Sequence, residues 1–270
     1  MSVPAWVEKF TYNASGPEQR WINLGSSPSE MVIGWVTAET DAQSVVYYGT
    51  KSGGPYSLSA TGAADSYTYG KYTSGLIHHV TLTGLNLNTP YYYVCGAAGA
   101  QSAEAAFNSS RGVGAVYPYT LAAIADLGES GAAATTVSQL VDGLDHIDAI
   151  QFNGDIACVD GRVAATAPRF AMRRALTPRT RAHAHAHFTH FRLLSYANGC
   201  ESKGCSTWDA LQRMMEPITK TMPTAVEIGN HEMIDYANGI SAISSQYRFA
   251  GMPFGTRTDK AGQQGVFYYS

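Results

Sequence analysis

The sequence predicts a two-domain protein in which an all-β sandwich precedes an α/β domain. Seven short strand-like segments with turn signals between them fill residues 19–107, and three apolar runs alternate with helical patterns after residue 118. The length of 270 residues also exceeds that of a typical single domain, roughly 100 to 200 residues. We expect a first domain over residues 1–110, a linker over 111–118 and a second domain over 119–270.

The first domain has the pattern of an immunoglobulin-like sandwich, in which short strands follow one another at regular spacing. Tyr91 follows Leu85-Asn-Leu-Asn-Thr-Pro90 at the start of a late strand, which predicts a tyrosine corner whose hydroxyl bonds to nearby backbone. We expect the other aromatic residues to pack in the core and across strands. The predicted strands are Gln19–Leu24, Met31–Thr37, Ser44–Gly49, Ser66–Tyr72, His78–Leu82, Tyr91–Ala97 and Glu104–Phe107.

In the second domain, polar residues follow three apolar strands. The strands end at Asp126-Leu-Gly128, at Gly154-Asp155 and at Gly229-Asn-His-Glu232. Helical patterns over Gly131–Leu144 and Thr207–Thr219 separate them, and this alternation predicts a parallel sheet. Ligands bind beyond the carboxyl ends of parallel strands, so we expect these residues to meet at one edge.

The second helical pattern also predicts its buried face. Four large apolar residues recur at helical spacing, and we interpret them as core rather than as a cofactor site. They are Trp208, Leu211, Met215 and Ile218.

Composition excludes some function classes. The net charge is -3 and the isoelectric point is about 6.2, which gives no support for nucleic acid as a partner. We predict no membrane span, because no run approaches the roughly 18 apolar residues that one requires. No signal peptide is visible at the N-terminus. Cys200 and Cys205 could close a small disulfide loop or be free buried thiols, and two sequons, at Asn13 and Asn108, would carry glycans only in a secreted protein.

Residues 156–193 differ in character from the rest of the chain. They hold most of its arginines and the low-complexity run Ala182-His-Ala-His-Ala-His-Phe-Thr-His190. A histidine tract can bind metal adventitiously, but we interpret this segment as an atypical, solvated insert without a native metal role. Translated non-coding sequence is the alternative, because the composition changes at both edges of the segment.

The ordered set of polar motifs resembles that of the binuclear metallophosphoesterases. The set consists of Asp126-x-Gly128, Gly154-Asp155, Tyr196 and Gly229-Asn-His-Glu232. Tyr196 and the preceding sandwich point within that superfamily to the purple acid phosphatases. Val46–Ser52, His78–Leu85 and Pro90–Cys95 are also similar to that family's N-terminal domain. The resemblance implies an immunoglobulin/fibronectin III-like sandwich followed by an incomplete α/β metallophosphoesterase domain.

The resemblance also implies a role for each motif residue. Asp126 and Tyr196 would bind Fe(III), and Asp155 would bridge it to a divalent ion, which is Zn, Mn or Fe. Asn230 would bind that second ion, and His231 would be catalytic, contacting the phosphate or protonating the leaving oxygen. Such a metal pair polarises a phosphoryl oxygen and generates a hydroxide nucleophile. The implied protein is a secreted acid phosphatase, a homodimer, acting on small phosphate monoesters.

The chain departs from the family pattern at two places. The family spacing is Gly-Asp-x-x-Tyr, and removal of Ile156–Leu193 would restore it as Gly-Asp-Leu-Ser-Tyr. The family's later histidine motifs are not found before Ser270, so we interpret the chain as truncated at its C-terminus and expect weak metal binding and little activity. A metallophosphodiesterase and a non-catalytic product whose sandwich mediates binding remain as alternatives.

Overall fold

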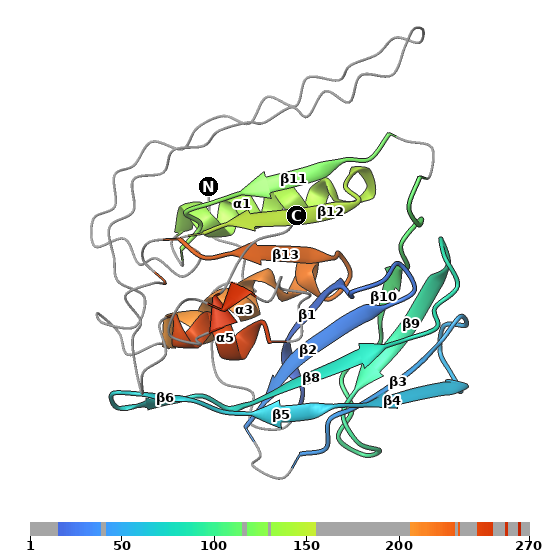
Figure 1. Ribbon diagram of the computed structural model, residues 1–270, viewed down its shortest axis with the longest axis horizontal. Coiled ribbons are helices and arrows are strands. Elements are labelled where there is room, and N and C mark those ends of the chain that lie inside the picture. Colours follow the sequence, from blue (N-terminus) through green and yellow to red (C-terminus); the bar gives the residue numbers. More distant parts are fainter. Residues whose placement is uncertain are drawn as a thin grey trace, which may run out of the picture.

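The computed structural model describes residues 16–38, 42–114, 118–128, 131–154, 206–229, 232, 242–250, 257–258 and 264–265. Figure 1 shows a β-sandwich formed by the first part of the chain and, above it, a sheet formed by β11, β12 and β13. The helices α3 and α5 lie between the two parts (Figure 1).

The sandwich consists of two antiparallel four-stranded sheets, as expected for the first domain. One sheet has the order β1 (Glu18–Leu24), β2 (Met31–Thr37), β8 (Leu76–Leu82), β5 (Ala63–Asp65). The other has the order β10 (Ala105–Asn108), β9 (Pro90–Cys95), β3 (Val45–Gly49), β4 (Leu58–Thr61). Their inner faces share a core that includes Ile33, Trp35 and Tyr93.

The tyrosine corner is present. The backbone N–H of Asn86 donates a hydrogen bond to the hydroxyl of Tyr91 over 3.0 Å, and the Tyr91 ring stacks on Phe107 with 5.7 Å between centroids. The expected aromatic packing is also found, because Trp35, Tyr48 and Tyr93 are buried. Tyr47 and Tyr92 point to the opposite face of their strands and are partly buried.

The single strand expected over Ser66–Tyr72 is wrong. The segment forms a two-stranded hairpin of β6 (Thr68–Tyr69) and β7 (Tyr72–Thr73). Gly70 lies in the turn with φ of 59°, a left-handed conformation that glycine adopts without a steric penalty. The chain therefore reverses where the apolar and β-branched residues alone suggested continuation. Strands β4 and β5 were not expected either, and their residues are mostly exposed.

The second part contains the expected alternation of strands and helices. Its elements in order are β11 (Leu121–Ile124), α1 (Gly131–Asp142), the 3₁₀ turn η1 (Leu144–His146), β12 (Ala149–Asn153), α3 (Ser206–Thr219), β13 (Thr224–Glu227) and α5 (Ile243–Arg248). The three strands pair in parallel in the order β11-β12-β13. Two further short strands, β14 (Arg257–Thr258) and β15 (Gln264–Gly265), pair antiparallel.

The helices α1 and α3 lie on the same face of this sheet. Strand order runs in one direction, and right-handed crossovers then place both connecting helices on one side. The face of α3 expected to be apolar is buried, with Trp208 and Ile218 at 0% exposure. It packs with Ile150 and Phe152 of β12 and Val226 of β13.

One apolar core joins the sandwich to the second part. Strand β2 is buried along its whole length because both of its faces are covered. Its inner residues belong to the sandwich core, whereas Val32 and Val36, together with Trp21, pack in the same cluster as Trp208 and Phe249. The Trp21 and Phe249 rings lie 5.3 Å apart.

Charged side chains surround this shared core. A β-bulge in β1 places Gln19 at φ of 57° and turns consecutive residues toward α3. Glu18 accepts two hydrogen bonds from Arg213, at 2.9 and 2.6 Å. Arg20 pairs with Glu216 at 2.7 Å. These pairs are largely buried, so they fix the orientation of α3 against the sandwich.

Candidate metal centre

The three strand ends lie together at the carboxyl edge of the parallel sheet. The backbone N–H of Asp126, just beyond β11, donates to the carbonyl of Gly154, just beyond β12, over 3.3 Å. Asp126 has φ of 52°, an uncommon conformation that aspartate tolerates better than most residues. Its side chain is half-buried. Backbone in such a sparsely populated conformation clusters at functional sites.

Gly154 and Gly229 are in backbone contact at this edge. A Cβ built on Gly154 would lie 2.6 Å from both the Cα and the N of Gly229, closer than real Cβ contacts allow. Gly154 also has φ of 73°. Glycine is therefore required here on two grounds, and the chain leaves β12 and β13 side by side at the residues that precede Asp155 and Asn230.

Glu232 contacts the backbone just beyond β13. Its Oε2 accepts a hydrogen bond from the backbone N–H of Gly229 over 2.7 Å, and the residue is only 3% exposed. The sequence interpretation gave Glu232 no role of its own. An acidic residue three positions after the N–H that it binds is the local signal that could have indicated this contact.

Of the five predicted site residues, only Asp126 belongs to the described part of the chain. Asp155, Tyr196, Asn230 and His231 lie outside it, as do the histidine tract, Cys200 and Cys205. Within the described ranges, no three His, Cys, Asp or Glu side chains are placed to hold a metal ion. The described cysteine, Cys95, is buried and free.

The described residues are compatible with a metal site at this edge. Asp126 supplies a carboxylate beside two glycine backbones that leave room for loops to approach each other. Carboxylate, phenolate and amide oxygens, the donors that the motifs contain, suit hard cations such as Fe(III) and Mn(II). The donor chemistry and the converging strand ends therefore fit the binuclear metal centre that the resemblance implies.

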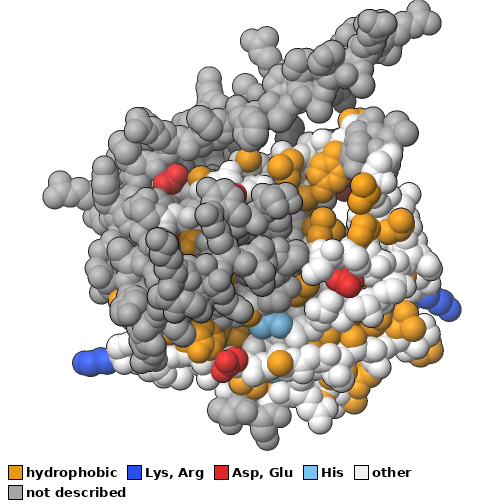
Figure 2. Space-filling model, in the orientation of Figure 1, with side chains coloured by type: hydrophobic (Ala, Val, Ile, Leu, Met, Phe, Trp, Pro, Cys, Tyr) orange, Lys and Arg blue, Asp and Glu red, His pale blue; other side chains and the backbone are white. Residues whose placement is uncertain are grey.

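A second group of polar residues lies on the helices that follow the strand ends. Asp209 of α3 and Arg248 of α5 form an ion pair of 2.8 Å whose guanidinium is fully buried. Sequence reasoning missed both, because no local pattern connects residues 39 positions apart. The described surface in Figure 2 has blue side chains only at two edges of the view, so no basic patch is seen on this described face.

Comparisons with known proteins agree with the sandwich fold of the first part of the chain. Residues 17–109 match the family described as purple acid phosphatase, N-terminal domain. Purple acid phosphatase 23 of Arabidopsis thaliana is 28% identical over 98% of this chain and 57% of that protein. The chain belongs to the purple acid phosphatase family.

Two further relatives fit this family. The phosphoenolpyruvate phosphatase of Allium cepa is 28% identical over 90% of this chain and 42% of that protein. The structure of a purple acid phosphatase from yellow lupin seeds superposes with a TM-score of 0.63, at 20% identity, over 87% of this chain and 40% of that one. The chain thus spans about half the length of the family members that it matches. None of the helices in the described ranges is long and apolar enough to cross a membrane.

Proposed function

We propose that this family member is an acid phosphatase that hydrolyses phosphate monoesters with a binuclear metal centre at the carboxyl edge of β11, β12 and β13. The observation that carries the proposal is the backbone contact of the three strand ends, at Asp126, Gly154 and Gly229. Each of these positions is, or directly precedes, a residue of the family's metal motifs. Chance Asp-x-Gly or Gly-Asp pairs have no reason to follow neighbouring parallel strands in this order.

The motif residues would hold the two ions as the family resemblance implies. Asp126 and Tyr196 would bind Fe(III), Asp155 would bridge to a Zn, Mn or Fe divalent ion, and Asn230 would bind that ion. When bound, the pair would polarise a phosphoryl oxygen and lower the pKa of water. His231 would orient the phosphate or protonate the leaving oxygen. Glu232 accepts a hydrogen bond from the Gly229 amide and would thereby restrain the backbone on either side of Asn230 and His231.

Monoesters are the preferred substrate class. The onion relative is named a phosphoenolpyruvate phosphatase, which makes phosphoenolpyruvate a specific monoester to test. A metallophosphodiesterase is the rival within the enzyme class. Hydrolysis of p-nitrophenyl phosphate and bis(p-nitrophenyl) phosphate separates the two, because a monoesterase favours the first substrate.

The family also suggests secretion, glycosylation and a homodimer. Asn108 is exposed at the end of β10, where a glycan can be attached, whereas Asn13 lies outside the described residues. The domain division at residues 110 and 119 belongs to the same proposal. A non-catalytic product that binds through its sandwich is the rival outside the enzyme class.

The test compares Asp126→Asn with Asp65→Asn in the full 270-residue chain. Asp65 is an exposed carboxylate of β5, so its replacement changes charge equally without touching the strand ends. With the named ligands alone we expect weak metal binding and low turnover, and therefore bound metal, measured by equilibrium dialysis at a defined metal concentration, is the primary readout. We expect Asp126→Asn to lose metal and Asp65→Asn to retain it. Equal metal content in both variants would favour the non-catalytic rival.

A further inference from the structure

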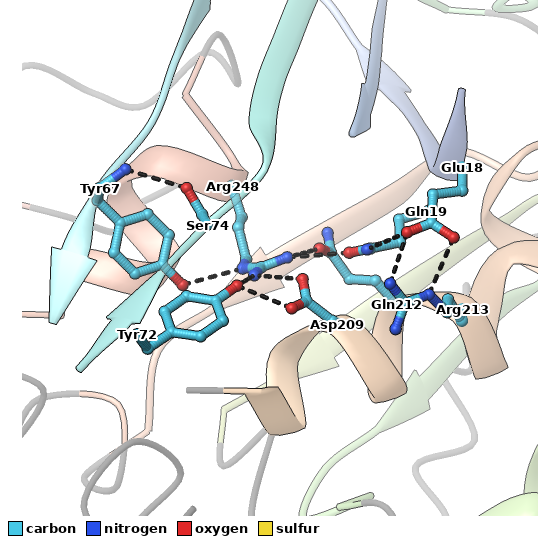
Figure 3. A network of polar contacts seen from close by, with 9 residues as sticks. All are labelled: Glu18, Gln19, Tyr67, Tyr72, Ser74, Asp209, Gln212, Arg213 and Arg248. Carbon is cyan, nitrogen blue, oxygen red and sulfur yellow. Dashed lines mark hydrogen bonds and ion pairs between the residues drawn. The ribbon is translucent and has the colours of Figure 1, made fainter. Parts of the chain in front are cut away.

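A fully buried guanidinium connects the sandwich with both helices that follow the motif segments. Arg248 of α5 has all five of its N–H donors in hydrogen bonds, which is the maximum for arginine. Figure 3 shows its side chain between tyrosines of the β6–β7 hairpin on one side and α3 on the other. The acceptors are Tyr67 at 3.2 Å, Tyr72 at 2.7 Å, Gln19 at 3.0 Å, Asp209 at 2.8 Å and Gln212.

The helices joined by Arg248 follow, in the sequence, the two segments that contain Asp155, Tyr196 and Asn230. The chain leaves the described part at Gly154 and returns at the start of α3, and Asp209 lies in the first turn of that helix. Between Gly229 and α5, which carries Arg248, only Glu232 is described. Both intervening segments contain motif residues, which are Asp155 and Tyr196 in the first and Asn230 and His231 in the second. The segments start at the glycine contact, and the helices at which they end are joined to each other by one buried ion pair.

Two tyrosine hydroxyls from the first domain bond to Arg248, and one of them also bonds to Asp209. Tyr72 accepts from Arg248 and donates to Asp209 over 2.9 Å, so its hydroxyl bridges the two helices. Tyr67 is 3% exposed and accepts from the Nε of Arg248. His79 of β8 contacts the carbonyl of Tyr247 over 2.9 Å and so holds α5 at a second point.

We propose that Tyr67 and Tyr72 of the first domain are positioning residues for the candidate metal centre, because they hold Arg248 against Asp209 and thereby fix where both motif segments return. The inference rests on the proposed function. It assigns the sandwich a role inside the catalytic unit, and the hairpin is the part that performs it.

If the contacts of Arg248 only stabilised the fold, their loss would have the same effect as the loss of any other buried contact between the two parts. Tyr93 provides that comparison. It is a buried tyrosine of the sandwich whose hydroxyl donates to the carbonyl of Lys220 over 2.7 Å, just beyond the opposite end of α3. Tyr93→Phe removes one hydrogen bond between the two parts but leaves α5 untouched.

The experiment compares Tyr72→Phe with Tyr93→Phe in the full chain by hydrogen–deuterium exchange and by titration with zinc(II) alone. We expect Tyr72→Phe to speed amide exchange in α5 and the first turn of α3 about tenfold, because hydrogen bonds to charged groups are lost. We expect zinc affinity to fall by a similar factor. Tyr93→Phe should leave both quantities at the wild-type value after matching for overall stability.

Equal effects of the two variants would overturn the inference, since the contacts of Arg248 would then be stabilising only. Asp126→Asn distinguishes this result from failure of the proposed function. If zinc binding does not depend on Asp126, the proposed function fails, and the positioning role that rests on it fails as well. If zinc binding depends on Asp126 but is weakened equally by Tyr72→Phe and Tyr93→Phe, the proposed function stands and the positioning role fails.

Discussion

Replacement of Arg248 by methionine should be among the most destabilising single changes in the described part of the chain. The guanidinium has no exposed surface, and the side chain of its partner Asp209 is 10% exposed. Methionine fills similar volume but leaves the buried carboxylate of Asp209 with a hydrogen bond from Tyr72 in place of its charged partner. Removing one partner of a buried ion pair costs about 3 to 5 kcal/mol.

The same variant should have a distinctive dependence on pH. In the wild type, burial alone would raise the pKa of Asp209, but the charge of Arg248 and hydrogen bonds from Arg248 and Tyr72 keep it below its usual value. Without Arg248, burial raises that pKa, and the native state of the variant then binds a proton at mildly acidic pH. The loss of stability should therefore be smaller at pH 5 than at pH 7.

Urea unfolding followed by tryptophan fluorescence measures this effect, because Trp21 and Trp208 lie in the shared core. The double variant Arg248→Met/Asp209→Asn removes both charges and should recover at least about 2 kcal/mol of the loss. Arg111→Met is the control, because its partner Asp148 forms a more exposed pair, and such pairs contribute about 1 kcal/mol or less. A cost for Arg248→Met as small as the control, or no recovery in the double variant, would refute the reasoning.

Two further predictions concern the sandwich histidine and the strand-end glycine. Burial, with a smaller effect of the neighbouring histidine, lowers the pKa of His78 to about 4, so stability should fall as pH drops from 6.5 toward 4. His78 should account for about 2 kcal/mol of the loss between pH 7 and pH 5 in urea unfolding. His78→Gln should remove that share, whereas the share of His79, whose pKa burial also lowers, should remain; His146→Gln, at an exposed site, should leave the slope unchanged. Gly154→Ala should lower the free energy of unfolding by at least about 2 kcal/mol more than Gly53→Ala. Both glycines have positive φ, but only Gly154 is in contact with other backbone. Equal losses in the two variants would contradict this contact.

Much of the fold was predictable because it depends on local periodicity. Alternation and turn residues indicate the sandwich strands, and helical spacing indicates the buried face of α3. The hairpin at β6 and β7 was not predictable in this way, since its turn depends on one left-handed glycine, Gly70, within a run of strand-forming residues. The bulge at Gln19 has no local signal either. Its conformation is stabilised by Glu216, 197 residues later.

In the candidate site too, features that follow from local sequence were predictable, and features that depend on distant contacts were not. The order of Asp126, Gly154 and Gly229 after apolar strands was sufficient to predict that they meet, because parallel strands share an edge. Arg248 carries no such signal. Its burial is possible only because five acceptors from β1, the hairpin and α3 converge on it, and those elements are distant in sequence.

The contacts of β1 weigh against a sandwich that acts as an independent binding module. Interfaces between domains are commonly polar and permit movement, but this one combines a shared apolar core with buried ion pairs. Separation would expose Trp21 and leave Glu18 and Arg20 without their partners on α3. A binding function would therefore have to use the outer face of the other sheet while the α3-facing surface stays covered. In the catalytic proposal, the sandwich acts through the surface that contacts α3 and α5. The second part of the chain covers this surface, as a role in positioning these helices requires.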